Sequence, residues 1–284
     1  MATLREKFYA GVMGFPVNHS RSPQIFSDLA RILGYPLDYR RIEVRPENWE
    51  MSVTTIQQLQ LFQGWNVTLP YKERFFARVD HLSPEAQAIG AVNVIRLARD
   101  GSLWGYNTDV FGVLKTLEEQ KVRVQGASAV IFGAGGAALA VSYVLGKLRA
   151  SEVWLVNRTL FRARTQAMRL RKLFPRTVFH SVEALPQRLD IPPRLFVNAT
   201  PLGMSGFPKK SLLPKRVEGE ALALDLVYHP EKTPFLQAAQ KQGLSAVNGL
   251  DMLLWQALAS WEIWVGKIPQ IQKVKNQLKQ GLKS

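Results

Sequence analysis

The chain has 284 residues, of which 46% are hydrophobic and 21% are charged, with 37 Lys and Arg against 22 Asp and Glu. These values are typical of a globular protein of about two domains and exclude a disordered or fibrous chain. The chain has no cysteine, which excludes disulfides, thiolate catalysis and cysteine zinc sites, and its four scattered histidines argue against a histidine metal site. We expect no metal.

The first third of the chain predicts alternating strands and helices. Ser22 and Pro23 are predicted to begin a helix as its cap and first-turn residue, and Gly34 to end it. Asp100 and Gly101 predict a hairpin turn. The strands are expected at residues 8–13, 38–44, 65–68, 91–97 and 102–106, and helices at 22–33 and 48–59. Such alternation predicts an α/β fold with a mostly parallel sheet.

The pattern restarts with a helix at Thr108 and Asp109. Strands are expected at residues 127–132, 152–156, 194–198 and 221–226, and helices at 135–148, 159–173, 250–265 and 269–282. Residues 205–220 are rich in glycine and proline and predict a mobile loop. We therefore divide the chain into a first domain at 1–108, a second at 109–248, and C-terminal helices at 249–284.

Two uncharged stretches resemble membrane signals. Residues 8–17 follow basic residues, but Gly14 and Pro16 interrupt them and no small-residue cleavage site follows. Residues 124–146 have the length of a membrane span but contain five glycines, so a buried strand, a turn and a helix explain them better. We expect a soluble, cytoplasmic protein.

A glycine-rich turn predicts a dinucleotide site. Residues 133–138 fit G-x-G-x-x-A, directly after an apolar strand and at the start of a helix. The first glycine allows a tight turn, the second lets a pyrophosphate approach the backbone, and the helix N-terminus offers unpaired N–H groups. The candidate cofactor residues of the turn are Gly133, Ala134, Gly135, Gly136 and Ala137.

The end of the next strand indicates which dinucleotide is bound. NAD sites usually place an acid there, but this chain has Asn157, Arg158 and Thr159, with Arg162 one helical turn later. A guanidinium pairs with the 2′-phosphate that distinguishes NADP, so the pattern favours NADP. The alternative is a surface arginine at a helix start, which the helix dipole disfavours.

The net charge of +15 is concentrated in the middle of the chain. Residues 109–248 carry 20 basic and 10 acidic side chains, whereas the segments before and after them have net charges of +2 and +3. A run without any acid contains Arg158, Arg162, Arg164, Arg169, Arg171, Lys172 and Arg176. It predicts either a polyanion-binding face or, more commonly, the solvated side of a helix.

Polar residues follow the predicted strands of the first domain, where open α/β sheets bind ligands. These candidates are Ser20, Ser22, Thr68, Lys72, Asn93 and Asp109. Each has a simpler alternative by itself: Ser22 and Asp109 as helix caps, and Lys72 as a solvated surface lysine.

Taken together, these residues resemble one family, the shikimate dehydrogenases. The shared motifs are HSRSP at 19–23, NVTLPYK at 66–72, NTD at 107–109, GAGGA at 133–137, NRT at 157–159, NATPLGM at 198–204, DLVY at 225–228, TPFL at 233–236, and Gln256 before WVG at 264–266. The chain departs from the family at Val94, where threonine is usual, and at Asp251, where glycine is common. We expect the departure at Asp251 to affect the fine specificity of the enzyme.

The resemblance implies reversible, NADPH-dependent reduction of 3-dehydroshikimate to shikimate, on the route to chorismate and aromatic amino acids. It implies a substrate domain, a Rossmann-like NADP domain, and C-terminal helices that return to the first domain. The substrate carboxylate is assigned to Ser20 and Ser22, and Thr200 and Gly249 are added to the cofactor residues. The ring oxygens are assigned to Thr68, Lys72, Asn93, Asp109 and Gln256, with Tyr228 nearby.

Lys72 and Asp109 are the implied catalytic pair, and the chemistry agrees. Hydride transfer to a ketone leaves an alkoxide, which an ammonium can stabilise and protonate while a carboxylate holds that ammonium in place. Two alternatives stay open: a quinate/shikimate dehydrogenase with relaxed substrate or cofactor choice, and, remotely, a basic nucleic-acid-binding protein. A monomer and a homodimer are both compatible with the sequence.

Overall fold

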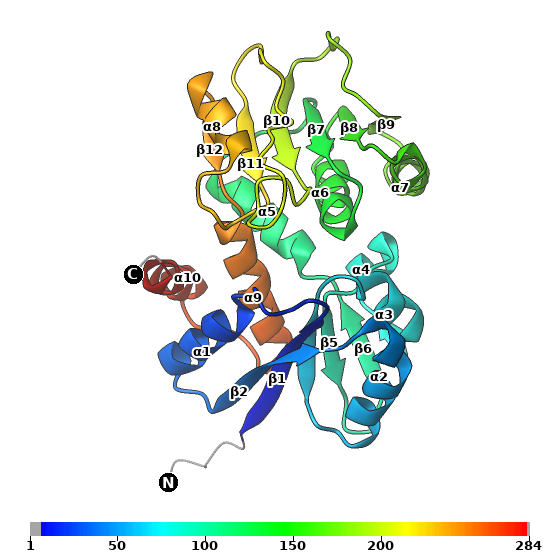
Figure 1. Ribbon diagram of the computed structural model, residues 1–284, viewed down its shortest axis with the longest axis vertical. Coiled ribbons are helices and arrows are strands. Elements are labelled where there is room, and N and C mark those ends of the chain that lie inside the picture. Colours follow the sequence, from blue (N-terminus) through cyan, green and yellow to red (C-terminus); the bar gives the residue numbers. More distant parts are fainter. Residues whose placement is uncertain (1–6, 283–284) are drawn as a thin grey trace. The chain divides into compact units, whose positions relative to one another are not determined.

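The computed structural model describes residues 7–282. The chain forms two compact units, the first made of the residues up to Phe111 and from Leu254 on, the second of residues 112–253. Each unit has its own six-stranded sheet and its own helices (Figure 1). The α/β class, the two units and the return of the C-terminal helices to the first unit confirm the predicted fold class. Both unit boundaries lie inside helices, a few residues after the expected domain limits.

The sheet of the first unit has the strand order β2-β1-β3-β5-β6-β4. Its strands are β1 (Phe8–Gly14), β2 (Leu37–Glu43), β3 (Gly64–Val67), β4 (His81–Leu82), β5 (Val94–Leu97) and β6 (Leu103–Tyr106). β1 pairs in parallel with β2 and β3, and β4 with β6. β5 is antiparallel to both β3 and β6, and Gly101, at φ +85°, makes the predicted hairpin turn.

The helices of this unit, including the two that cross its boundaries, are α1 (Ser22–Leu33), α2 (Trp49–Gln58), α3 (Lys72–Arg78), α4 (Pro84–Ile89), α5 (Asp109–Glu119), α9 (Leu250–Trp264) and α10 (Ile271–Gly281), with a short 3₁₀ turn η1 (Pro46–Asn48) before α2. α1 buries Ile25, Phe26 and Leu29 on one face and ends at Gly34, whose φ of +58° is accessible to glycine.

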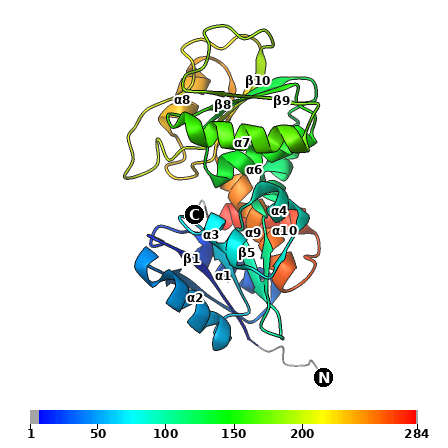
Figure 2. The same cartoon turned by 90° about the vertical axis from the view of Figure 1, so that its right-hand side faces the viewer.

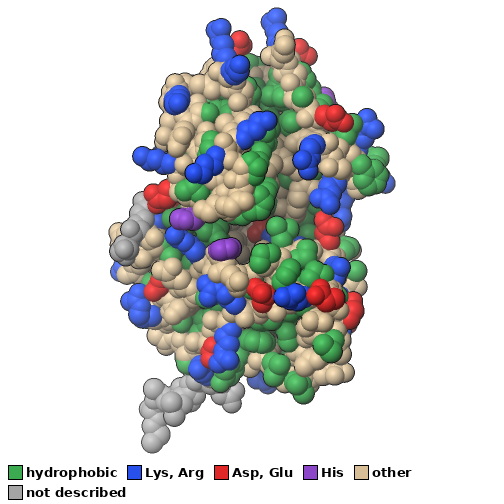
Figure 3. Space-filling view, in the orientation of Figure 1, with side chains coloured by type: hydrophobic (Ala, Val, Ile, Leu, Met, Phe, Trp, Pro, Cys, Tyr) green, Lys and Arg blue, Asp and Glu red, His purple; other side chains and the backbone are tan. Residues whose placement is uncertain are grey.

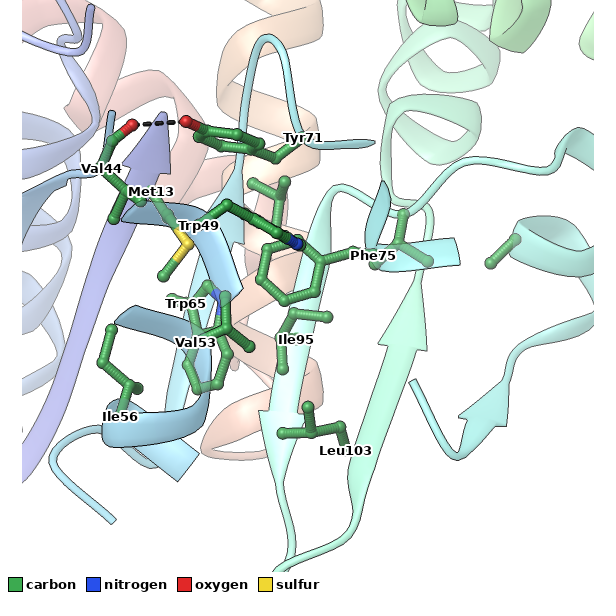
Figure 4. Close-up of a cluster of buried hydrophobic side chains, with 13 residues drawn as sticks. Met13, Val44, Trp49, Val53, Ile56, Trp65, Tyr71, Phe75, Ile95 and Leu103 are labelled. Carbon is green, nitrogen blue, oxygen red and sulfur yellow. Dashed lines mark hydrogen bonds between the residues drawn. The ribbon is translucent and has the colours of Figure 1, made fainter. Parts of the chain in front are cut away.

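An aromatic core lies between α2, α3 and the sheet of the first unit (Figure 4). Trp49 stacks on Tyr71 with ring centroids 4.5 Å apart and meets the ring of Phe75 edge-on at the same distance. The Tyr71 hydroxyl donates to the carbonyl of Val44, so its polar atom is satisfied inside the core. This packing fixes the segment between β3 and α3, which carries Lys72.

The second unit has six parallel strands in the order β12-β11-β10-β7-β8-β9. They are β7 (Ser128–Phe132), β8 (Glu152–Val156), β9 (Val178–Val182), β10 (Pro193–Asn198), β11 (Leu222–Asp225) and β12 (Ser245–Val247). In chain order within the unit this is 6-5-4-1-2-3, the order of a dinucleotide-binding Rossmann sheet.

The helices wholly inside this unit are α6 (Gly136–Lys147), α7 (Leu160–Leu173) and α8 (Pro234–Lys241). Figure 2 shows α7 lying along the sheet. Residues 205–220 contain no helix or strand, in agreement with the predicted loop. Within the described part of the chain, no helix is both long and apolar enough to cross a bilayer.

Candidate active site

The topology of the first sheet brings the candidate substrate residues together at one end of its strands. β1 and β3 are parallel neighbours, and the segments with Ser20 and Thr68 follow their carboxyl ends. β5 runs the other way, so Asn93, directly before it, lies at the same edge. The first residue of β5, Val94, pairs with Tyr106 of β6, after which the chain reaches Asp109. The sequence predicted a strand over 91–97, but pairing starts only at Val94, which leaves Asn93 outside the ladder.

Lys72 and Asp109 form a short ion pair at this edge. Lys72 Nζ lies 2.6 Å from Asp109 Oδ2, and the two side chains are 20% and 9% exposed. Both residues begin helices, α3 and α5. A helix N-terminus favours the carboxylate and disfavours the ammonium, so Asp109 compensates the unfavourable position of Lys72. Lys72 is mostly covered and paired with Asp109, so it is no solvated surface lysine.

The second oxygen of Asp109 is held by Asn93. Asn93 Nδ2 donates to Asp109 Oδ1 at 2.9 Å and to Thr108 Oγ1 at 3.1 Å, while Asn93 Oδ1 accepts from the Thr108 backbone N–H at 2.7 Å. Asn93, Thr108 and Asp109 are all buried. With both carboxylate oxygens occupied, Asp109 has a fixed orientation.

Ser20 lies between β1 and α1 and Ser22 at the start of α1, but the predicted role of Ser22 as a helix cap is wrong. Arg21 occupies the N-cap position, and Ser22 is the first helical residue. Its N–H is satisfied by Ser20 Oγ at 3.2 Å. The Ser22 hydroxyl contacts Tyr39 instead, and burial raises the pKa of Tyr39 well above its ordinary value. The Tyr39 hydroxyl in turn donates to Asn66 Oδ1 at 2.8 Å.

The structure adds polar residues to this site that the sequence reasoning did not single out. They are Tyr39, Asn66, Thr108 and Ser260. Asn66 and Thr108 lie inside the quoted NVT and NTD motifs, so their positions were visible. Ser260 stands one helical turn after Gln256 on α9, a spacing that puts both residues on one helix face. Gln256 and Thr68 belong to the same unit, whereas Tyr228 belongs to the second.

The predicted dinucleotide turn has the expected backbone in the second unit. Gly133 adopts φ +112°, which glycine tolerates, and a Cβ there would lie 2.9 Å from the carbonyl oxygen of Ala199. Gly135 is extended, and a Cβ there would meet no protein atom within 4 Å. The space over Gly135 is therefore open to a ligand, at the N-terminus of α6. These residues fit a pyrophosphate.

Neighbouring segments hold the turn in place. The Gln166 side-chain amide, from α7, donates to the Ala134 carbonyl at 3.0 Å. Thr200 Oγ1 donates to Asn198 Oδ1 at 2.6 Å, and a Cβ at Gly133 would lie 3.2 Å from the Thr200 methyl group. Thr200 thus lies beside the turn. No sequence motif pointed to Gln166.

Arg158 and Arg162 are exposed at the end of β8 and the start of α7. The first turn of α7 has no acid. Asn157 Nδ2 donates to the Thr159 carbonyl at 2.8 Å and shapes this segment. Two exposed cations at a helix start suit a 2′-phosphate. On the face seen in Figure 3, the Lys and Arg side chains of the second unit are spread over the surface and do not gather in one patch.

Gly249 has a structural reason of its own to be glycine. A Cβ at this position would overlap the carbonyl of Leu226, and the Gly249 N–H donates to the Val227 carbonyl at 3.3 Å. Close backbone approach therefore requires glycine at this position whether or not it contacts a cofactor.

A buried carboxylate orders the loops after β10 and β11. Asp225 accepts from Asn198 Nδ2 at 2.9 Å, from the Val227 N–H at 3.0 Å and from the Thr233 hydroxyl. Burial raises its pKa from 3.8 to about 6, although the hydrogen bonds act in the opposite direction. Through Asn198, this carboxylate is connected to Thr200.

Comparison with known proteins places the chain in a family. Residues 12–95 match the family model of the shikimate dehydrogenase substrate binding domain, and residues 249–279 match that of the shikimate 5′-dehydrogenase C-terminal domain. A shikimate dehydrogenase (NADP(+)) of Carboxydothermus hydrogenoformans is 36% identical over 280 residues, covering 94% of this chain and 95% of the relative. The chain belongs to the shikimate dehydrogenase family.

Two further relatives of the family extend the comparison. The shikimate dehydrogenase (NADP(+)) of Rhodospirillum rubrum is 40% identical over 265 residues, covering 92% of this chain and 93% of that one. The crystal structure of shikimate 5-dehydrogenase from Thermus thermophilus, in complex with NADP(H) and shikimate, has a TM-score of 0.79 and 33% identity, covering 96% of this chain and 99% of that one. The family predicted from the motifs is confirmed.

Proposed function

We propose that the chain catalyses the reversible reduction of 3-dehydroshikimate to shikimate with NADPH, a step toward chorismate and aromatic amino acids. Family membership makes it an NADP-dependent oxidoreductase. The observation that carries the proposal is the buried Asn93–Asp109–Lys72 arrangement, which presents one oriented ammonium at the ligand edge of the first sheet.

The reaction needs a hydride and a proton. Bound NADPH supplies the hydride to the ketone carbon. Lys72 hydrogen-bonds to the ketone oxygen, stabilises the negative charge that develops on it, and donates a proton to the resulting alkoxide. Asp109 remains a carboxylate and keeps Lys72 oriented. In the reverse direction, neutral Lys72 accepts the proton of the shikimate hydroxyl.

The remaining residues bind and orient the substrate. Ser20 and Ser22 hold its carboxylate beside the start of α1, and the family motif assigns Tyr228 to substrate binding. Thr68, Asn93 and Gln256 hold the ring oxygens together with Lys72 and Asp109. The assignments of Tyr228 and Gln256 are supported by the family motif alone. The other assignments are also supported by the places of the residues in the first unit.

The second unit binds the cofactor in this proposal. The turn from Gly133 to Ala137, at the N-terminus of α6, would hold the pyrophosphate of the cofactor. The segment Asn157–Thr159, with Arg162, holds the adenosine 2′-phosphate, and Thr200 and Gly249 complete the site. The protein acts in the cytoplasm, where NADPH is available.

A steady-state assay tests the proposal. NADP-linked oxidation of shikimate is followed by the absorbance of the reduced cofactor, and quinate and NAD replace shikimate and NADP in parallel reactions. We expect kcat/KM to be highest for shikimate with NADP. A higher value with quinate or NAD would favour the quinate/shikimate alternative, and no activity with any pair would contradict the proposal.

A further inference from the structure

A buried serine of α9 is hydrogen-bonded at the centre of the first unit's polar network. Ser260, on α9, is 0% exposed. Its hydroxyl donates to the carbonyl of Gln256 at 2.8 Å. With its single proton used in this way, its lone pairs accept from Asn66 Nδ2 at 3.0 Å and from the Thr108 hydroxyl at 3.3 Å.

These contacts continue without a break to the Lys72 ammonium. Thr108 is hydrogen-bonded to Asn93 through both its backbone N–H and its hydroxyl. Asn93 holds one oxygen of Asp109, whose other oxygen holds Lys72. Networks of this kind act as a unit in a buried setting, because each partner limits the rotamers of the next.

Ser260 also joins segments that are far apart in the sequence. Asn66 is the third residue of β3, Thr108 follows β6, and Ser260 comes more than 150 residues later. These hydrogen bonds therefore join α9 to β3 and to the segment after β6. The same helix turn carries Gln256, whose carbonyl the hydroxyl contacts.

We propose that Ser260 is a positioning residue for the reaction: its hydroxyl fixes Thr108 and Asn93, and through them the orientation of Asp109 and Lys72. This inference rests on the proposed function. Ser260 does not touch the substrate in this account. It acts because a misplacement of about 1 Å at a catalytic group costs on the order of 10²-fold in rate.

The same chain offers a matched control. Ser142, on α6, is also 0% exposed and also donates to the carbonyl four residues earlier, that of Ala138, at 2.7 Å. Among the described residues it has no second hydrogen-bond partner. Replacing either serine with alanine removes the same helical back-bond, but only Ser260→Ala removes a link to the catalytic pair.

The test compares kcat for shikimate oxidation in Ser260→Ala and Ser142→Ala, each made in the wild-type and in the Lys72→Ala background. In the wild-type background we expect Ser260→Ala to lower kcat about tenfold, with a smaller change in the KM for NADP. Ser142→Ala should stay within about twofold of wild type. In the Lys72→Ala background, the loss caused by Ser260→Ala should shrink below about twofold, because the group that it positions is gone.

Three results would overturn the inference: Ser260→Ala at the wild-type kcat, an equal loss in both serine variants, or an undiminished loss without Lys72. If Ser260→Ala does not fold, Ser260→Cys keeps a side chain of similar size with only weak hydrogen bonding and should show the same dependence on Lys72. A wild-type protein without shikimate activity would instead contradict the proposed function, so the two failures are distinguishable.

Discussion

The carboxylate of Asp109 lies 2.6 Å from the ammonium of Lys72, and this pair joins the starts of two helices, α3 and α5. Neither residue is freely solvated, and Asn93 holds the remaining carboxylate oxygen of Asp109. An ammonium fixed in this way is prepared to meet an oxygen that becomes negative, without reorganisation when the reaction occurs.

Arg158 should determine the choice between NADP and NAD. Arg158→Ala should weaken NADP binding by about 1.5–3 kcal/mol, since a charge-assisted contact to the 2′-phosphate is lost, and should leave NAD within a few-fold. Titration of both cofactors measures this. The control is Arg176→Ala, an exposed arginine beyond α7. Equal weakening of the two cofactors by Arg158→Ala would contradict the assignment.

The two glycines of the dinucleotide turn should respond differently to alanine. Gly133→Ala forces a side chain into φ +112° and against the Ala199 carbonyl, so the free energy of unfolding should fall by about 1–3 kcal/mol. Gly135→Ala places a methyl group in open space in an extended conformation, so stability should change by less than about 1 kcal/mol.

The two variants are distinguished by measuring both the free energy of unfolding and the affinity for NADP of each. Gly135→Ala should lose affinity because its methyl group occupies the space of the pyrophosphate. An unchanged affinity in a folded Gly135→Ala protein would show that the phosphates lie elsewhere.

Ser22 should act on substrate binding more than on rate. The substrate carboxylate keeps its charge throughout the reaction, so Ser22→Ala should raise the KM for shikimate about tenfold with little change in kcat. The control is Ser27→Ala, an exposed serine on the same helix. A wild-type KM in both Ser22→Ala and Ser20→Ala would argue against a carboxylate site at the start of α1.

Asp225 should make stability depend on pH. Because its pKa is raised to about 6 in the folded state, its contribution to the free energy of unfolding is full below pH 3.8 and is lost as the pH rises through about 6. Two pKa units correspond to about 3 kcal/mol. An asparagine at position 225 keeps an oxygen that accepts from Asn198 and Val227, and it does not titrate.

The measurement is urea unfolding of wild type and Asp225→Asn between pH 4 and 7. The free energy of unfolding of the variant, relative to wild type, should rise by about 2 kcal/mol across this range. The exposed Asp190 provides the control Asp190→Asn. A constant difference between Asp225→Asn and wild type would mean that Asp225 has the same pKa folded and unfolded.

Local patterns were sufficient to predict most of the fold. Gly34 ends α1, the Asp100-Gly101 hairpin forms, and the strand at 152–156 has the predicted bounds. The elements that were not predicted are α3, β4, α4, β9, α8 and β12. α8 had a readable signal, because Thr233 caps it through the Leu236 N–H and Pro234 follows in its first turn. β12 has only three residues, too few for a periodic pattern.

The site was harder to predict than the fold. Its residue types and motifs could be read, but the partners of each side chain depend on strand direction and register. Asn93 faces Asp109 because β5 runs antiparallel to β3, and Ser260 meets Asn66 because α9 returns to the first sheet. Both relationships join residues that are remote in sequence and carry no local signal.

Lys72 gives the most direct test of the account. The measurement is kcat of Lys72→Ala for NADP-linked shikimate oxidation at saturating shikimate, beside Asp109→Asn and the double variant. We predict that Lys72→Ala loses about 10²–10⁴-fold in kcat with folding and NADP binding intact, and that the double variant loses far less than the product of the two single losses. A kcat within a few-fold of wild type would contradict the account, since the proton would then come from Asp109 or an ordered water.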